Sequence, residues 1–358
     1  MRASAAGEVL RFIRRHSARS ASESAFNALA LRVFRSQFEK NALYRRFCVM
    51  ENVTPENLKS WKDIPAMPAA AFKELVLASF PAGKKKKIFK TSGTTLRQAQ
   101  GGAGGPGPGV HYFETLALYE ASILPPFKKH TLKGGRRAFY FLMPTAQEAP
   151  ASSLSHMMKV VNARFARGKG KFYVRKGEPQ FGSLARNLQK EKKEVLLLAT
   201  AFALKGFLDY LEQRDLRLRL KRGSRLMETG GFKGRTHEIP KAALYRLCRE
   251  RLGISDFVSE YGMTELSSQY YGRNGGPFAA PEWMRAVIVD PRTGKECPKG
   301  RTGLLKHVDL ANTGSVMAVQ TEDLGKAKGN GFELLGRAKW SEARGCSLPY
   351  ERFLRSSE

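Results

Sequence analysis

The chain has 358 residues, 42% of them hydrophobic, so it is long enough to bury a substantial core. Its 62 lysines and arginines outnumber its 32 aspartates and glutamates, which gives a formal net charge of +30. The basic residues are spread along the chain, and no helix-turn-helix, zinc-finger or RNA-binding signature accompanies them, so specific nucleic-acid binding is not expected. The charge predicts attraction to anionic ligands or acidic proteins.

Targeting and redox signals are weak. No apolar run approaches the roughly 20 residues of a transmembrane segment. The first twenty residues, rich in Arg, Ala and Ser, argue against a secretory signal and leave an organelle transit peptide open. The four cysteines, Cys48, Cys248, Cys297 and Cys346, lack the paired spacing of a zinc site or a disulfide framework. We therefore expect a soluble, cytoplasmic protein.

The first periodic segment begins at Ser20 and Glu23, which have capping-box spacing. Apolar residues from Phe26 to Phe38 recur at helical spacing and predict a helix packed on the core. A short strand ending at Lys90 then leads into KTSGTT. Four hydroxyls around a glycine suit a loop that wraps an anion such as a polyphosphate, and a polar surface turn is the alternative.

The glycine- and proline-rich stretch 97–110 cannot form a packed element. We interpret it as a mobile loop, either a lid over bound phosphates or a tolerated insertion. Strands and helices then alternate, which predicts an α/β fold with a mostly parallel sheet. From 285 to 336, short strands joined by glycine-containing turns predict an antiparallel subdomain. The expected strands of the main sheet are 136–143, 195–199, 225–227 and 257–259, and its helices are 152–161, 204–213 and 241–252.

Four further motifs follow KTSGTT in order: ETGGFKG at 228–234, SEYGMTELSSQ at 259–269, QTEDLG at 320–325 and LLGRAKWSEARGCSL at 334–348. Together they resemble the adenylate-forming superfamily, and within it the acyl-protein synthetases, or luciferin-component ligases, of the bacterial luminescence fatty acid reductase system. The resemblance implies a basic extension at 1–24, a large adenylate-forming domain at 25–336, and a short tail at 337–358 where relatives carry a C-terminal lid domain.

The resemblance also implies a reaction, in which a carboxylic acid such as a fatty acid attacks ATP, with Mg²⁺ as cofactor, to form an acyl-adenylate. The loop residues expected to hold the phosphates are Thr91, Ser92, Gly93, Thr94 and Thr95. The family loop usually continues with Gly and then Lys. This chain has Leu96 and Arg97 instead, and Arg97 could supply the missing charge.

The other motifs imply further roles. The residues expected to contact the nucleotide are Gly230 and Gly231 near the adenine, Tyr261 stacked on it, Thr264 at the α-phosphate and Asp323 at the ribose hydroxyls. Arg337 matches the arginine near the domain hinge and, like Thr264, is expected to be catalytic. Glu265 would bind the metal, since Mg²⁺ takes one or two protein carboxylates. For Tyr261, Glu265, Asp323 and Arg337 the structural alternatives are a core aromatic, a helix-start charge, a turn aspartate and a solvated arginine.

Cys346 is the residue that most clearly indicates which branch of the superfamily the chain resembles. In acyl-protein synthetases a cysteine near the C-terminus accepts the acyl group as a thioester, and an acyl reductase would be the next partner. Arg344 would favour the thiolate of Cys346, although a buried structural cysteine is the alternative. Two other functions stay open: delivery to coenzyme A or an acidic acyl carrier protein, and nucleic-acid binding or scaffolding on a degenerate adenylation fold. His156 could line an acyl pocket or be a core histidine, and His111 is equally open.

Overall fold

The computed structural model describes residues 4–81, 87–91, 107–132, 135, 137–230, 239–338 and 353. Contacts within the chain divide it into two compact units. Unit 1 comprises 1–125, 263–269 and 279–358, and unit 2 comprises 126–262 and 270–278. Within the described residues, none of the helices combines the length and apolar character that crossing a membrane requires.

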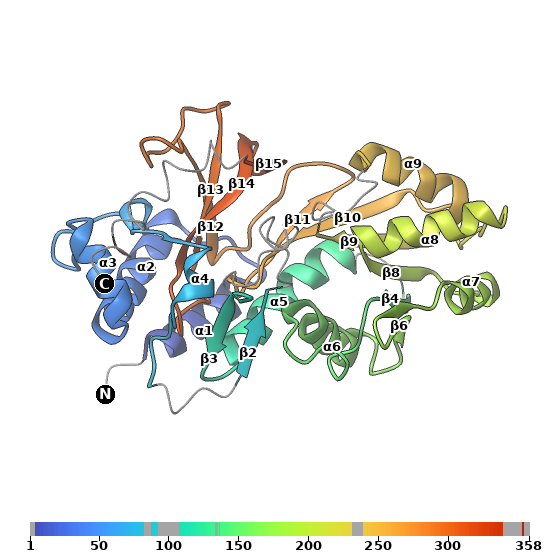
Figure 1. The fold of residues 1–358 in the computed structure, drawn as a ribbon, viewed down its shortest axis with the longest axis horizontal. Helices are drawn as coiled ribbons and strands as arrows, with labels where there is room; N and C mark the ends of the chain where they lie inside the picture. Colours follow the sequence, from blue (N-terminus) through green and yellow to red (C-terminus); the bar gives the residue numbers. More distant parts are fainter. Residues whose placement is uncertain are drawn as a thin grey trace. The chain divides into compact units, whose positions relative to one another are not determined.

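Unit 2 is built on a six-stranded sheet with the order β11-β10-β9-β8-β4-β5 (Figure 1). From β5 to β10 each strand runs parallel to its neighbour, and β11 pairs antiparallel with β10. The predicted mostly parallel sheet is therefore confirmed. Its strands are β4 (Ala138–Leu142), β5 (Lys171–Phe172), β8 (Val195–Thr200), β9 (Arg225–Thr229), β10 (Asp256–Tyr261) and β11 (Tyr270–Arg273).

Helices bury the central strands of this sheet, which explains why β8 reads as an unbroken apolar run. On one face α7 (Phe181–Lys190), α8 (Ala201–Gln213) and α9 (Lys241–Leu252) form a single apolar core with the strands. Figure 1 shows α6 (Ser153–Phe165) on the other side of the sheet. A small hairpin, β6 (Val174–Arg175) and β7 (Glu178–Pro179), completes the unit.

Local signals account for the helix boundaries in unit 2. Helix α9 occupies the predicted range, with Pro240 directly before it and Gly253 at φ +69° ending it. Helix α8 begins three residues earlier than predicted because Thr200 caps it. The Thr200 hydroxyl accepts a hydrogen bond from the backbone N–H of Ala203 at 3.2 Å.

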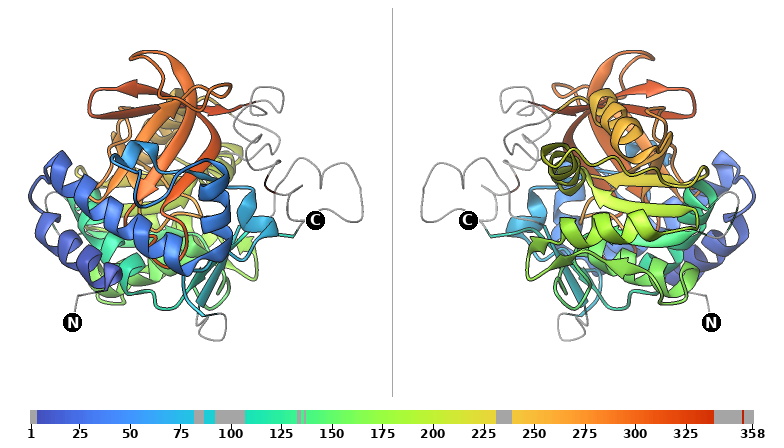
Figure 2. Two further views of the ribbon diagram at one scale, coloured as in Figure 1. Left: turned by 90° about the vertical axis from the view of Figure 1, so that its left-hand side faces the viewer. Right: turned by 90° about the vertical axis from the view of Figure 1, so that its right-hand side faces the viewer.

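Unit 1 contains a five-stranded sheet in which β12 (Met284–Val289), β13 (Thr302–Asp309), β14 (Ala318–Lys328) and β15 (Gly331–Arg337) pair antiparallel in sequence order. The predicted antiparallel strands are therefore confirmed. A two-residue strand, β1 (Met67–Pro68), adds parallel to β14, and a separate hairpin joins β2 (Lys87–Lys90) to β3 (Val110–Phe113). The left view of Figure 2 shows the blue helices of the unit beside its orange strands. These helices are α1 (Ala5–His16), α2 (Glu23–Lys40), α3 (Ala42–Met50), the 3-10 turn η1 (Trp61–Asp63) and α4 (Ala71–Glu74), and α5 (Ala117–Thr131) starts in the same unit.

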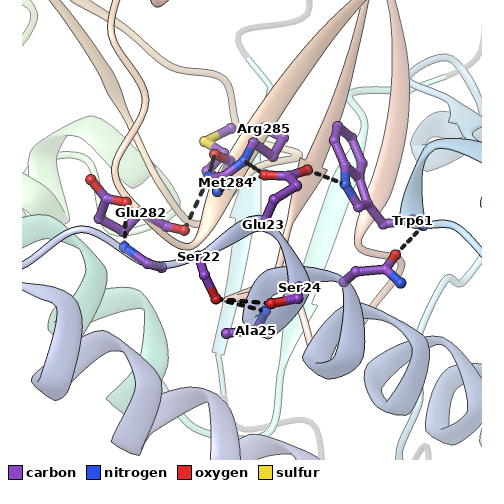
Figure 3. Close-up of polar contacts among 10 residues, drawn as sticks. Ser22, Glu23, Ser24, Ala25, Trp61, Glu282, Met284 and Arg285 are labelled. Carbon is purple, nitrogen blue, oxygen red and sulfur yellow. Dashed lines mark hydrogen bonds and ion pairs between the residues drawn. The ribbon is translucent and has the colours of Figure 1, made fainter.

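The capping box predicted at Ser20 and Glu23 is wrong. Helix α2 begins one residue after Ser22, whose side chain accepts from the N–H of Ala25 at 3.2 Å. The Glu23 carboxylate instead accepts from the indole N–H of Trp61 at 2.5 Å and pairs with Arg285 of β12 at 3.3 Å (Figure 3). Tertiary partners therefore replace the local backbone contact. The apolar stripe of the helix is buried as predicted, except that Phe38 is half-buried.

Candidate functional site

The predicted site residues fall into three groups. Unit 1 contains Thr91, Thr264, Glu265, Asp323 and Arg337, whereas Gly230 and Tyr261 belong to unit 2. Ser92, Gly93, Thr94, Thr95, Gly231 and Cys346, together with Arg97 and most of the glycine-rich stretch, lie outside the described residues. Their roles stay predictions.

In unit 1, two of the predicted residues form an ion pair. Asp323 and Arg337 are directly opposite each other on β14 and β15, and Arg337 Nε lies 3.3 Å from Asp323 Oδ1. The aspartate side chain is 17% exposed and the arginine side chain 66% exposed, so the guanidinium extends from a buried contact into solvent. The backbone N–H of Asp323 donates to the Thr321 hydroxyl at 3.1 Å, which stabilises the strand at this position.

Glu265 belongs to the same electrostatic neighbourhood. The residue is 6% exposed, and burial raises the pKa of its carboxyl to about 7, while a hydrogen bond with its own backbone, Arg337 and Lys73 oppose the rise and Asp323 adds to it. A buried carboxylate whose negative charge is not fully offset by neighbouring positive charges favours the binding of a cation. Within the described chain, no three His, Cys, Asp or Glu side chains gather as a ready-made metal site.

Two side chains from distant segments hold the backbone of Thr264 and Glu265. His111 Nδ1 lies 2.8 Å from the carbonyl oxygen of Thr264, and Asn312 Nδ2 donates to the carbonyl oxygen of Glu265 at 2.7 Å. The residues that follow are fixed as well. Buried Asp309 accepts hydrogen bonds from the N–H groups of Ser267 and Ser268 at 2.9 and 2.8 Å.

Sequence reasoning missed Asp309 and Asn312 and assigned no role to His111. A signal for the first two was present, because DLAN places a polar residue at the end of the buried strand β13 and another three residues later. His111 carries no such signal. Its importance comes from a contact that spans 153 residues of the sequence.

Thr91 directly follows β2, and its contacts close the β2–β3 hairpin. Its N–H donates to the Gly109 carbonyl at 2.9 Å, and its hydroxyl accepts from the Gly109 N–H at 2.8 Å. Gly109 has little room for a side chain, because a Cβ there would lie 3.2 Å from Thr91 Cγ2. The hairpin is therefore closed at Thr91 and Gly109 by two hydrogen bonds.

In unit 2, Gly230 and Tyr261 lie at the carboxyl ends of the adjacent parallel strands β9 and β10. Gly230 has φ +70°, a conformation that favours glycine, and a Cβ there would meet nothing within 4 Å. The Tyr261 ring packs 5.8 Å from the ring of Tyr270 and 5.7 Å from that of Phe278. Carboxyl ends of parallel strands are where α/β folds bind ligands.

The same strand ends carry a second buried glutamate. The Glu260 carboxylate accepts a hydrogen bond from the Thr229 hydroxyl, and burial raises the pKa of Glu260 to about 7. Glu228, also buried, contributes to this rise. Glu228 is itself paired with Lys241 at 3.0 Å. Sequence reasoning singled out neither carboxyl, although both stand next to the TGG and YGMTE motifs.

A family model described as acyl-protein synthetase, LuxE, matches residues 151–354, more than half of the chain. The chain belongs to the LuxE acyl-protein synthetase family. It is thus an enzyme, a ligase. Two proteins named long-chain-fatty-acid–luciferin-component ligase are each 19% identical to it. The protein from Aliivibrio fischeri aligns over 89% of this chain and 86% of its own length, and that from Vibrio harveyi over 88% and 84%.

Solved structures agree on the fold of this acyl-protein synthetase. An open conformation of 2-hydroxyisobutyryl-CoA ligase superposes with a TM-score of 0.66 at 14% identity, covering 88% of this chain and 74% of the ligase. The same ligase in its postadenylation state gives 0.66 at 15% identity, covering 88% and 67%. At such identities the likeness concerns the fold, and it confirms the adenylate-forming α/β architecture.

Proposed function

We propose that this acyl-protein synthetase uses ATP to convert a carboxylic acid, most favourably a fatty acid, into an acyl-adenylate, and then transfers the acyl group to Cys346 as a thioester. The observation that carries the proposal is the burial of the Glu265 carboxyl in the unit that also contains the Asp323–Arg337 ion pair, with both charged residues near enough to influence that carboxyl. Family membership supplies the acyl chemistry.

In the first step a carboxylate oxygen of the acid attacks the α-phosphorus of ATP, the bond to pyrophosphate breaks, and a mixed anhydride forms. Both reactants are anions, so the protein's task is to position them and to compensate their charge. Thr264 and the loop from Thr91 to Thr95 would donate hydrogen bonds to phosphate oxygens, and Asp323 would accept from the ribose hydroxyls. When bound at Glu265, Mg²⁺ would supply further charge compensation.

Gly230, Gly231 and Tyr261 would contact the adenine. Gly230 already adopts the positive φ that lets backbone pass close to a planar ring without a side chain in the way. Arg337 would compensate developing charge while its pairing with Asp323 holds it in place. The motif order that the chain shares with the family supports these assignments.

In the second step the thiolate of Cys346 attacks the acyl carbon, a C–S bond forms, and AMP leaves with the electron pair of the broken C–O bond. A comparison with other cysteines supports the choice. Burial raises the pKa of both Cys48 and Cys248 to about 12, so their thiolate fraction near neutral pH is very small. An acyl reductase that consumes the thioester is the proposed downstream partner.

The test is to incubate the protein with ATP, Mg²⁺ and a radiolabelled fatty acid and to measure hydroxylamine-sensitive label on the protein. We expect the label to disappear in Cys346→Ser while ATP–pyrophosphate exchange persists. Cys297→Ser is the matched control, because Cys297 is the half-exposed cysteine among those described, and it should keep the label. Label retained by Cys346→Ser would remove Cys346 from the reaction.

The net charge of +30 favours a second acceptor, an acidic acyl carrier protein. This alternative keeps the adenylation step and changes the destination of the acyl group, with coenzyme A as a further acceptor of the same kind. Steady turnover with free acceptor, at a rate unchanged by Cys346→Ala, would favour it. The scaffold alternative is set aside because the family is one of enzymes.

A further inference from the structure

The successive carbonyl groups of Thr264 and Glu265 are each hydrogen-bonded by a different side chain, and the proposed function gives these two side chains no role. His111 contributes from β3 and Asn312 from the turn after β13. A carbonyl oxygen can only accept a hydrogen bond, so His111 Nδ1 must carry the proton. Burial lowers the pKa of His111 to about 4, which keeps the ring neutral near pH 7.

Both donors are themselves held in place. The His111 ring lies between Phe72, at 5.6 Å between ring centroids, and Phe113, at 4.1 Å. The Asn312 side-chain oxygen accepts from the Ser267 hydroxyl at 2.5 Å, and its backbone carbonyl accepts from Gln37 of α2 at 2.7 Å. Each donor side chain is therefore fixed by its own contacts, and its hydrogen bond restrains the Thr264–Glu265 backbone.

The location of His111 adds a second consequence. His111 on β3 is directly opposite Phe89 on β2, and Phe89 precedes Thr91 by two residues. The β2–β3 hairpin, in which Thr91 directly follows β2, is thus hydrogen-bonded, through the His111 imidazole, to the carbonyl of Thr264. Fixing two consecutive peptide planes fixes the backbone angles of Glu265 between them, and with them the direction in which its side chain leaves the chain.

We propose that His111 and Asn312 are positioning residues for acid activation: they hold the Thr264 and Glu265 carbonyls so that the Thr264 hydroxyl and the Glu265 carboxylate keep a fixed placement relative to the β2–β3 hairpin and Thr91. The proposal rests on the proposed function, because it assigns purpose to the placement of these two side chains. Catalytic groups displaced by about 1 Å can lose about a hundredfold in rate, so a strong dependence on such contacts is expected.

Three substitutions at position 111 separate positioning from packing. His111→Asn places an amide N–H close to the position of Nδ1, His111→Gln places it near that of Nε2, and His111→Phe removes the donor while keeping a ring. A cavity of about 220 Å³ that His111 and Asn312 both border gives side chains of altered shape room to settle. Asn312→Asp replaces the donor of the second contact without changing its size.

The readouts are kcat and KM for ATP–pyrophosphate exchange, the Kd of ATP with Mg²⁺ by calorimetry, and the thermal midpoint. We expect His111→Phe, His111→Gln and Asn312→Asp to lower kcat for exchange and to weaken calorimetric binding, each by about tenfold or more. His111→Asn should recover both to within about threefold of the original chain. Recovery by Asn and not by Gln is a result that a packing role would not produce.

Equal exchange and equal nucleotide affinity in His111→Asn, His111→Gln and His111→Phe would overturn the proposal. If His111→Phe does not fold, the Asn and Gln variants decide alone, since equality between them overturns it as well. Glu265→Gln separates a failure of the proposed function from a failure of the positioning role. If Glu265→Gln keeps full exchange, the proposed function fails at that residue; if it loses exchange while the His111 variants keep it, only the positioning role fails.

Discussion

Asp323 and Arg337 are opposite each other across the antiparallel strands β14 and β15, with 3.3 Å between the guanidinium Nε and the carboxylate Oδ1. The resemblance assigns one of them to the ribose and the other to the hinge. Their pairing would place the two proposed roles at one location in unit 1. Removing either charge therefore alters the partner as well as the proposed ligand contact.

We expect Asp323→Asn to raise the KM for ATP by about tenfold to a hundredfold, because a hydrogen bond to a charged group contributes about 1.5–3 kcal/mol. The thermal midpoint should hardly change, since an ion pair with one exposed partner contributes about 0–1 kcal/mol. Initial rates of pyrophosphate exchange at varied ATP concentration measure the first effect.

A second ion pair of the same two strands provides the control. Lys328 Nζ lies 3.2 Å from the Glu333 carboxylate, and both side chains are about half exposed. Glu333→Gln should leave the KM for ATP unchanged. A similar rise in both variants would mean that the strands, and not Asp323, determine nucleotide affinity.

The core of unit 2 should depend strongly on Phe207, which is fully buried on α8. Phe207→Ala should lower the free energy of unfolding by about 3–5 kcal/mol, because it removes apolar contacts and leaves a cavity. Phe202→Ala on the same helix should change it by less than about 0.5 kcal/mol, since Phe202 is 44% exposed. Urea denaturation followed by circular dichroism compares the two, and equal losses would contradict the described packing of α8.

Stability should fall with rising pH because of Glu260. Its pKa is raised from 4.5 to about 7 by burial, so between these values the folded chain holds a proton that the unfolded chain has released. The contribution of the protonated carboxyl is therefore full below pH 4.5 and is lost as pH rises through about 7. Glu260→Gln cannot titrate, so it should gain stability relative to the original chain between pH 5 and pH 8, by at most about 3 kcal/mol.

Urea unfolding of both proteins across this pH range measures the difference. Parallel stability curves for Glu260→Gln and the original chain would contradict the raised pKa. Thr229→Val provides a further check, because the Thr229 hydroxyl opposes the rise. In that variant the fall in stability should move to higher pH.

The sheet and helices of unit 2 could be predicted because their signals are local. The run at Val195–Leu198 indicates a strand buried on both faces, and Pro240 and Gly253 delimit α9. Helix α5 was not predicted: it contains Pro125 and Pro126, residues that usually end a helix. There the tertiary structure overrides the local preference.

The candidate site could be predicted only in part. Motif order located Asp323, Arg337 and Glu265, and the structure brings these three into one electrostatic neighbourhood. The donor at His111 could not be found, because a hydrogen bond to a backbone carbonyl leaves no trace in the residue that accepts it, and the polar residues of DLAN do not indicate which carbonyl Asn312 contacts. Such contacts depend on which distant segments pack together.

Activation of a carboxylic acid is best tested by ATP–pyrophosphate exchange with Mg²⁺ across a panel of carboxylic acids of increasing chain length. We expect exchange that requires both the acid and Mg²⁺, that varies with chain length, and that falls by about tenfold or more in Glu265→Gln. Exchange absent with every acid, in protein shown to be folded by its thermal transition, would contradict the activation of a carboxylic acid by this chain.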